Sequence, residues 1–325
     1  MERVIDLIKS SKSPLITTHH HPDGDGLGSQ VALYSGLKQL GKRALAMNAD
    51  AVPPKFKFLD PSYSIQCYRS PADVKGVDLV LVADTGDWRM LGSFAEPLQR
   101  IGCPVIFLDH HPPVQKASSA IHWVDVNCQA TGELVFSLLS SLGVRLDPTM
   151  ATAIYAAMIT DASAFRFRGT TEGFHKTLGE ILEINVDVEN VYQHLYAQDS
   201  VAKVRLFGHV LREVELLEQQ QVAVLTIPAA LREEIGATIE DTHSFVEHLT
   251  LMKGVRVGVL FREDPGGLVK VSLRSVDVSV LALAEQFDGG GHPFAAGMLV
   301  PGTLDHVKRD VLNAVRQCLK DGANC

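Results

Sequence analysis

The sequence predicts an α/β protein with two domains, and three observations support this fold class. Short apolar runs alternate with helical patterns through the first half of the chain, as in proteins with a parallel sheet. The 325 residues are 46% hydrophobic, enough for a larger core than one domain usually contains. Shorter, strand-rich segments begin after residue 220. We therefore expect an N-terminal domain over 1–195, a helical linker over 196–220 and a smaller C-terminal α/β domain over 221–325.

The N-terminal domain is expected to hold a parallel sheet with helices on both faces. Its strands should be buried on both sides, because each is a short, continuous apolar run. The predicted strands are 14–19, 43–48, 77–84 and 103–110. The predicted helices are 28–41, 131–143 and 150–165, with Thr131 as the cap of the second. Ligands of such sheets bind at the carboxyl ends of the strands, so residues that follow the strands are candidates for a site.

The C-terminal half predicts a different arrangement of elements. A long amphipathic stretch over 200–220 predicts a helix that links the two domains. Beyond it, the predicted strands are 222–227, 255–263 and 268–275. The turn "DPGG" at 264–267 predicts that the last two strands form a hairpin.

Charge and composition argue against several classes of protein. The net charge is -8 and the pI about 5.9, so no basic field attracts long nucleic acid or an anionic membrane. Five cysteines without a CxxC pair predict neither a disulfide framework nor a structural zinc site. The first residues lack the apolar segment of a signal peptide, and no apolar run reaches about 18 residues. We therefore expect a cytoplasmic protein without membrane contact.

Acidic and histidine residues cluster at the ends of the predicted elements. They are His19, Asp23, Asp25, Asp84, Asp109, His110, His111 and Asp161. Any one of the aspartates alone is best explained as a solvated side chain or a helix cap. Together these residues offer more ligands than one divalent ion can bind. Two ions about 3.5 to 4 Å apart that share a carboxylate can bind them. Asp and His without Cys suit Mn²⁺, with Mg²⁺, Co²⁺ or Fe²⁺ as alternatives.

Four motifs carry a resemblance to the DHH phosphoesterase superfamily. They are "HHHPDGD" at 19–25, "ADTGD" around Asp84, "DHH" at 109–111 and "MITDASAFRF" around Asp161, in the order found in that family. The C-terminal "GGGHPFAAG" at 289–297 resembles the glycine-rich motif of the substrate domain in many members. One glycine-rich loop is weak evidence, but its position after four metal motifs makes an accidental match improbable.

The resemblance implies a role for each residue of the cluster. His19 and Asp23 would hold one metal ion, and Asp84 would bridge it to a second. The other ligands that it implies for the second ion are Asp25, His110 and Asp161. Asp109 would orient an imidazole and bind no metal itself. His111 would lie nearest the scissile phosphate, as a hydrogen-bond donor to its oxygen or to the leaving group, so His111 and Asp84 are the expected catalytic residues.

The remaining residues of the first motif are expected to be structural. The family pattern does not require histidine at position 20 or 21, and a relative often has asparagine at position 21. Neighbouring side chains of a strand point to opposite faces, although His21 can still reach the substrate. Gly26 and Gly28 should allow a tight start to the following helix, and Ser29 should cap it or lie in its first turn.

The C-terminal domain offers groups that can bind phosphate. Arg274, followed by Ser275, lies near the end of a predicted strand and can bind a phosphate through two hydrogen bonds. Lys270 and Ser272 share its face of the strand. The glycine-rich motif offers close backbone approach and one side-chain donor for an anion or a base. Its expected substrate contacts are Gly289, Gly290, Gly291 and His292.

The resemblance implies hydrolysis of a phosphate ester by water that two metals activate. Class II inorganic pyrophosphatases lack the GGGH motif, and RecJ-type exonucleases are usually larger, with DNA-binding modules that this chain has no room for. The remaining compact group is similar to bifunctional oligoribonucleases with 3'-phosphoadenosine 5'-phosphate (PAP) phosphatase activity. We expect a Mn²⁺-dependent exoribonuclease and phosphatase that converts very short RNA and dinucleotides such as pApA to mononucleotides, and PAP to AMP.

Two alternatives remain open at this point. A cyclic-di-AMP phosphodiesterase would act on the closed ring faster than on linear pApA. A nucleotide-binding protein that has lost its chemistry should lack some metal ligands, and none of the expected ligands is missing here. The expected partners are short RNA oligonucleotides, dinucleotides and nucleotide phosphates. A homodimer is an alternative to a monomer, because relatives are often dimers.

Overall fold

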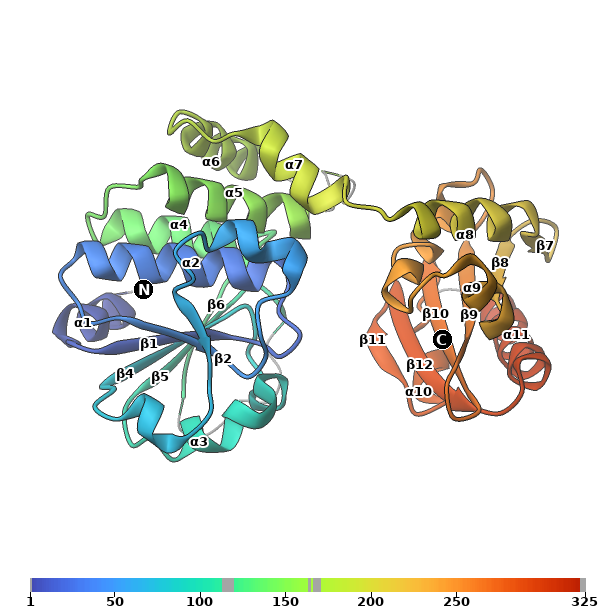
Figure 1. The fold of residues 1–325 in the computed structure, drawn as a ribbon, viewed down its shortest axis with the longest axis horizontal. Coiled ribbons are helices and arrows are strands. Elements are labelled where there is room, and N and C mark those ends of the chain that lie inside the picture. Colours follow the sequence, from blue (N-terminus) through green and yellow to red (C-terminus); the bar gives the residue numbers. More distant parts are fainter. Residues whose placement is uncertain (1, 113–119, 163–164, 166–170, 322–325) are drawn as a thin grey trace. The chain divides into compact units, whose positions relative to one another are not determined.

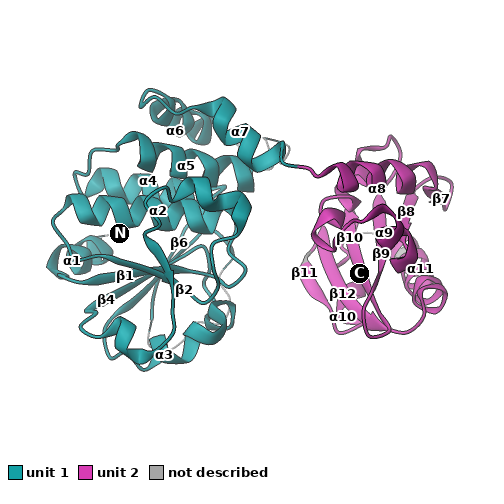
Figure 2. Ribbon diagram, viewed as in Figure 1, with its two compact units in different colours: residues 1–198 teal, residues 199–325 magenta. Residues whose placement is uncertain are grey.

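A computed structural model describes residues 2–112, 120–162, 165 and 171–321 of the protein. The chain divides into two compact units, Met1–Gln198 and Asp199–Cys325 (Figure 2). Each unit combines helices with one six-stranded sheet, which confirms the predicted two-part α/β fold. In the described residues, no helix is both long and apolar enough to cross a membrane.

The first unit is built on a sheet in which neighbouring strands are all parallel (Figure 1). Its strands are β1 (Pro14–Thr18), β2 (Leu45–Asn48), β3 (Ile65–Cys67), β4 (Leu79–Ala83), β5 (Val105–Asp109) and β6 (Ile121–Val124). The order across the sheet is β3-β2-β1-β4-β5-β6. The chain therefore reverses its direction of growth between β1 and β4. In open sheets of this class, the carboxyl ends of the strands at such a reversal form the crevice where ligands bind.

Both faces of this sheet are covered, as the continuous apolar strands predict. Every residue of β1, β4 and β5 is buried. One face shares a core with α2 (Gly24–Gln39), α4 (Thr131–Ser141) and α5 (Pro148–Asp161). The opposite face packs against η3 (Trp88–Phe94) and α3 (Ala95–Gln99). The remaining helices of the unit are α1 (Glu2–Ser10), η1 (Pro54–Leu59), η2 (Pro71–Val74), α6 (Glu172–Leu182) and α7 (Val188–Tyr196).

Helix α2 begins at Gly24, earlier than the predicted start at residue 28. The Asp23 side chain caps it by accepting hydrogen bonds from the N–H groups of Asp25 and Gly26, both at 3.1 Å. Such a cap satisfies N–H groups that have no partner within the helix. Because the helix starts directly after Asp23, Asp25 lies in its first turn and is fully buried.

Gly26 and Gly28, which were expected to allow a tight start to the helix, lie inside α2. A Cβ atom at Gly28 would collide with the backbone carbonyl of Ala153 in α5. Helices α2 and α5 can therefore approach closely only because glycine stands there. This close approach holds the first turn of α2 beside the last turn of α5, where Asp161 lies.

Other boundaries also differ from the predicted ones. The predicted helix over 150–165 ends at Asp161, and residues 163–164 lie outside the described part of the chain. Strands β3 and β6 were not predicted, because their three or four residues are partly exposed and show no clear period. The predicted helix over 200–220 ends at Arg212, and a short strand follows it.

The second unit holds a mixed sheet with the order β11-β12-β10-β9-β8-β7. Its strands are β7 (Glu215–Leu217), β8 (Val222–Ile227), β9 (Val257–Asp264), β10 (Leu268–Ser275), β11 (Gly290–His292) and β12 (Ala295–Pro301). The predicted hairpin is present: β9 and β10 are antiparallel, and Gly266 and Gly267 adopt positive φ in the turn. Its helices are α8 (Val201–Arg212), α9 (Ala229–Ile235), η4 (Glu240–Thr242), η5 (Val246–Leu251), α10 (Leu281–Glu285) and α11 (Leu304–Asp321).

Candidate active site at the carboxyl ends of the central strands

Asp84 stands directly after β4, at the reversal point of the first sheet. Its φ of 63° lies in the left-handed region, which residues other than glycine rarely adopt. The Asp84 N–H donates to the Leu108 carbonyl of β5 at 2.8 Å, so strand pairing continues up to this residue. A conformation of this kind costs on the order of 1–3 kcal/mol and is retained where the surrounding structure holds it. Here it accompanies a carboxylate that is only 3% exposed.

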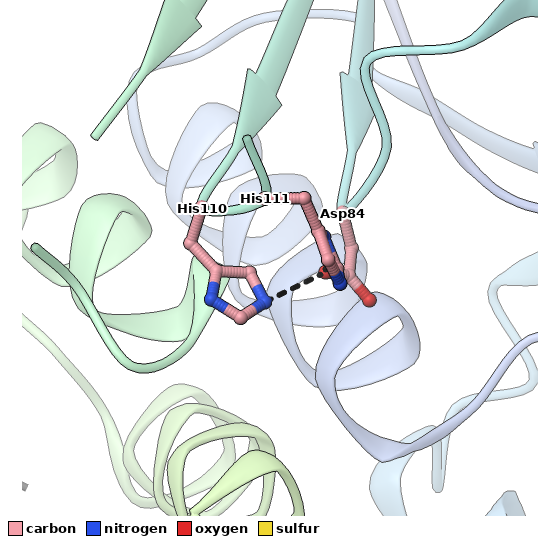
Figure 3. A group of neighbouring side chains, drawn as sticks. All are labelled: Asp84, His110 and His111. Carbon is pink, nitrogen blue, oxygen red and sulfur yellow. Dashed lines mark ion pairs between the residues drawn. The ribbon is translucent and has the colours of Figure 1, made fainter. Parts of the chain in front are cut away.

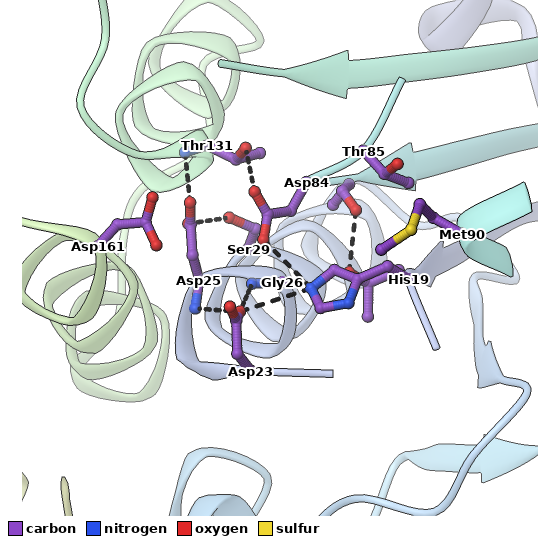
Figure 4. Close-up of polar contacts among 12 residues, drawn as sticks. His19, Asp23, Asp25, Gly26, Ser29, Asp84, Thr85, Met90, Thr131 and Asp161 are labelled. Atoms are coloured by element: carbon purple, nitrogen blue, oxygen red, sulfur yellow. Dashed lines mark hydrogen bonds and ion pairs between the residues drawn. The ribbon is translucent and has the colours of Figure 1, made fainter. Parts of the chain in front are cut away.

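One group of side chains surrounds His19, which follows β1 (Figure 4). Its Nε2 atom lies 3.4 Å from Asp84 Oδ2 and 3.6 Å from Asp23 Oδ1. Its Nδ1 atom lies 2.9 Å from the carbonyl oxygen of His20, which can only accept a hydrogen bond. Nδ1 is therefore the donor in that contact, and Nε2 is the ring atom that faces the carboxylates and could bind a metal ion. Ligand atoms of the three residues all lie within 4.8 Å of one another, a spacing that suits one divalent ion.

A second group surrounds His110, which follows β5. Its Nε2 atom lies 2.9 Å from Asp161 Oδ2, 3.7 Å from Asp84 Oδ1 and 3.9 Å from Asp25 Oδ2. This nitrogen is buried, and among the described residues it has no aligned hydrogen-bond partner. Buried side-chain nitrogens usually have a partner, so the position suits a metal ligand. Asp84 presents Oδ2 to the first group and Oδ1 to the second.

The amino end of α4 completes the surroundings of the buried carboxylates. Thr131 N donates to Asp25 Oδ2 at 2.7 Å, and Gly132 N donates to Asp25 Oδ1 at 2.9 Å. The Thr131 hydroxyl donates to Asp84 Oδ1 at 3.0 Å. The sequence predicts Thr131 as a helix cap, but Ala130 occupies that position and Thr131 contacts the site instead. In the sequence, the only indication of a role for Thr131 was its position at the start of a predicted helix.

The electrostatics of the site favour divalent cations. Burial, followed by the charges of Asp84, Asp161 and Asp23, raises the pKa of Asp25 well above its ordinary value. Burial is also the main reason that the pKa of Asp84 is raised. For His19, burial opposes the charged form, but the nearby carboxylates outweigh it and raise the pKa to about 10. Divalent ions would offset this concentration of negative charge, so the residues present fit a pair of such ions.

His111 and Asp109 form a separate pair next to these groups. Asp109 Oδ1 accepts hydrogen bonds from the backbone N–H of His111 at 3.1 Å and from its Nδ1 at 2.8 Å. The Asp109 hydrogen bond outweighs burial and raises the pKa of His111 to about 9. His111 also lies close enough to Asp84 and His110 to form a third group of ligand atoms (Figure 3). The His111 nitrogen that faces Asp84 is Nδ1, which lies 4.0 Å from Asp84 Oδ1 and is already bonded to Asp109.

His20 and His21 lie at the outer edge of the site. The backbone N–H and the Nδ1 atom of His20 both contact the Met90 carbonyl, at 2.6 and 2.7 Å, which ties this loop to η3. His21 adopts a φ of 51°, and its N–H donates to Asp50 Oδ2 at 2.8 Å. Glycine and asparagine tolerate this left-handed conformation better than most residues do. The imidazole of His21 is 86% exposed.

In the second unit, Arg274 lies on β10 and already has protein partners. Its guanidinium donates to Glu247 Oε1 at 2.8 Å and to the Leu273 carbonyl at 2.9 Å. About a third of the Arg274 side chain is exposed. Ser275 ends the same strand, and its hydroxyl accepts a hydrogen bond from the Val278 N–H at 3.0 Å.

The glycine-rich motif forms the antiparallel pair of β11 and β12 beside β10. Gly291 has a φ of 142°, and a Cβ there would collide with backbone atoms of β12. A Cβ at Gly289 would lie against the Gly297 carbonyl at 2.5 Å, whereas Gly290 has open space around it. Glycine at 289 and 291 is therefore required for strand packing, and Gly290 leaves its backbone accessible. The side chain of His292 lies outside the described part of the chain.

Comparisons with known proteins agree with these features. Residues 14–158 match the DHH family, N-terminal domain, and residues 219–321 match the DHHA1 domain. A protein of Thermus thermophilus named "Bifunctional oligoribonuclease and PAP phosphatase NrnA" is 34% identical, over 98% of this chain and 94% of its own length. A protein of Bacillus subtilis with the same name is 27% identical, over 87% of this chain and 88% of its own length.

Solved structures show a similar fold. An exopolyphosphatase-related protein from Bacteroides fragilis has a TM-score of 0.89 at 24% identity, over 98% of this chain and 95% of its own. RecJ of Thermus thermophilus in complex with Mn²⁺ has a TM-score of 0.54 at 16% identity, over 97% of this chain and 54% of its own. The protein therefore belongs to the DHH family of phosphoesterases, which hydrolyse phosphoester bonds, and it joins a DHH domain to a DHHA1 domain.

Proposed function

We propose that this protein hydrolyses very short oligoribonucleotides and dinucleotides such as pApA to mononucleotides, and PAP to AMP, with two divalent metal ions. One observation carries the proposal: two groups of potential ligand atoms meet at the two oxygens of the buried Asp84 carboxylate. The names of the relatives from Thermus thermophilus and Bacillus subtilis support oligoribonucleotides and PAP as substrates.

In this proposal, His19, Asp23 and Asp84 hold one ion. The ligands of the second ion are Asp25, His110, Asp161 and the other oxygen of Asp84. Oxygen and imidazole ligands without sulfur favour Mn²⁺, with Mg²⁺, Co²⁺ or Fe²⁺ as alternatives. When bound, two such ions activate water for attack at phosphorus and stabilise the charge on the phosphoryl oxygens.

His111 acts on the substrate in this proposal. With its Nδ1 proton donated to Asp109, the protonated ring can donate from Nε2 to a phosphate oxygen or to the leaving oxygen. The hydrogen bond to Asp109 contributes most to the raised pKa of this ring, about 9, and so favours its protonated form. Asp109 thereby sets both the orientation and the protonation state of the donor.

The second unit carries further groups that can bind a nucleotide in this proposal. Arg274 exchanges its contact with Glu247 for a substrate phosphate, and a phosphate offers the same two-oxygen geometry as a carboxylate. Ser275, the open backbone at Gly290 and His292 add contacts to the phosphate or the base. The net charge of -8 supports substrates that carry few phosphates, because long strands require a basic surface.

The test is a substrate panel with the full chain and each of Mn²⁺, Mg²⁺, Co²⁺ and Fe²⁺. The panel holds a length series of 5'-labelled RNA, linear pApA, cyclic-di-AMP and PAP, and products are separated by chromatography. We expect dimers and PAP to be cleaved fastest, with Mn²⁺ the most effective ion. Faster cleavage of long strands than of dimers would contradict the proposal, and faster cleavage of cyclic-di-AMP than of pApA would identify a cyclic dinucleotide as the substrate. D84A, which removes the bridging carboxylate, is the inactive control.

A further inference from the structure

Thr131 contacts two carboxylates of the candidate metal site through two different groups. Its hydroxyl donates to Asp84 Oδ1 at 3.0 Å, and its backbone N–H donates to Asp25 Oδ2 at 2.7 Å (Figure 4). The residue is completely buried. Thr131 therefore connects Asp84, which both groups share, to Asp25, which belongs to the second group only.

The position of Thr131 is set by how α4 packs on α5. A Cβ atom at Gly132 would approach the Cβ of Ala157 to 2.9 Å, so only glycine lets the start of α4 come this close to α5. Gly132 N can then reach Asp25 Oδ1 at 2.9 Å, next to the contact that Thr131 N makes. Two N–H groups of a helix start therefore hold both oxygens of Asp25. Together with the Ser29 hydroxyl, which donates to Asp25 Oδ1 at 3.2 Å, they fix the plane of that carboxylate.

The hydroxyl has a different effect on Asp84. A carboxylate oxygen has two lone pairs, and Thr131 occupies one lone pair of Oδ1. The other faces His110, whose Nε2 lies 3.7 Å away, while Oδ2 faces His19 at 3.4 Å. The contact thus opposes rotation of the carboxylate, which would turn either oxygen away from its group of ligands. The contacts of this carboxylate with His19 and His110 are made by residues that are themselves proposed metal ligands.

We propose that Thr131 is a positioning residue, which sets the spacing and orientation of Asp84 relative to Asp25 so that both ions bind at once. The inference rests on the proposed two-ion function and adds to it a residue that binds neither ion nor substrate. Groups that orient metal ligands commonly change metal affinity by about 10- to 100-fold when they are removed. The same range is expected for the hydroxyl of Thr131.

The test replaces the hydroxyl and keeps the backbone contacts to Asp25. T131V removes the hydroxyl at nearly constant volume, and T131S restores it. T17V is the matched control, because Thr17 is a completely buried threonine of β1 whose hydroxyl contacts Asn48 and no carboxylate. Binding of Mn²⁺ alone is measured by titration calorimetry, and electron paramagnetic resonance reports magnetic coupling between paired Mn²⁺ ions. T131A provides a second variant without the hydroxyl if T131V does not fold.

We expect the wild type, T131S and T17V to bind two Mn²⁺ ions per chain with a coupled resonance signal. T131V should bind the second ion at least about tenfold more weakly and lose the coupled signal, with folding unchanged by tryptophan fluorescence. Two tightly bound, coupled ions in T131V would overturn the role of Thr131 and leave the two-ion proposal intact. Fewer than two ions in the wild type would overturn both.

Discussion

Mn²⁺ should stabilise the first unit of the protein and leave the second unit unchanged. The carboxylates of Asp25 and Asp84 are buried beside Asp23 and Asp161, and the pKa values of both are raised because charge is unfavourable there. Ions that bind only the folded state stabilise it by about 2.7 kcal/mol per site at a free concentration of 100 times Kd. Two sites therefore contribute about 5 kcal/mol.

The change in melting temperature that this free energy produces depends on the size of the first unit. The unit spans residues 1–198, and a domain of that size gains roughly 2–4 °C per kcal/mol. The expected rise is about 10–20 °C. The two tryptophans, Trp88 and Trp123, both lie in the first unit, so their fluorescence during heating reports that unit alone.

Asp84→Asn should remove most of this response, because a neutral amide cannot bridge two ions. Without metal, D84N should melt at or above the wild-type temperature, since one repelling charge is gone. Asp6→Asn is the control, because Asp6 is an exposed carboxylate on α1 in the same unit. An unchanged wild-type melting temperature with Mn²⁺, or an equal rise in D84N, would refute the reasoning.

Four further substitutions test other parts of the structure. R274A should raise KM about 10- to 100-fold in steady-state assays with little change in kcat, because one charge-assisted contact contributes about 1.5–3 kcal/mol; a fall in kcat alone would argue against a binding role. D109N should lower kcat and leave Mn²⁺ affinity within about tenfold, since Asp109 orients His111; loss of both ions would instead make it a ligand. G28A should lower the free energy of unfolding by about 1–3 kcal/mol in urea, because its Cβ meets α5; an unchanged midpoint would refute the contact. Burial opposes charge on Asp78, but hydrogen-bond donors at residues 11–13 outweigh burial and lower the pKa of this carboxyl. D78N should therefore destabilise the protein above about pH 4 and match the stability of the wild type once the pH falls below the folded pKa. An equal loss of stability at all pH values would refute this.

The sequence was sufficient to predict the fold class and the residues that converge in the first unit. Continuous apolar runs identified β1, β4 and β5, because strands buried on both faces have few other compositions. His19, Asp84 and His110 then followed from their places after those strands, where the topology of a parallel sheet brings side chains together. This part of the site depends on the strands lying parallel in one sheet, which the pattern of elements predicts.

Features that depend on how helices pack could not be predicted in the same way. The contact of Thr131 with Asp84 depends on the approach of α4 to α5, and nothing near residue 131 in the sequence indicates that partner. The role of Gly28 depends on Ala153, a residue far along the chain. Likewise, Arg274 was expected to bind phosphate, but its contact with Glu247 arises from the packing of η5 against β10, which the sequence does not indicate.

The central claim is that Asp84 bridges two ions at the carboxyl ends of β1 and β4. Crystals grown with Mn²⁺ and measured at the manganese absorption edge test it most directly. We predict two anomalous peaks about 3.5 to 4 Å apart, one beside His19 and one beside His110, with an oxygen of Asp84 directed at each. A single peak held by Asp84, His110 and His111 would contradict the account.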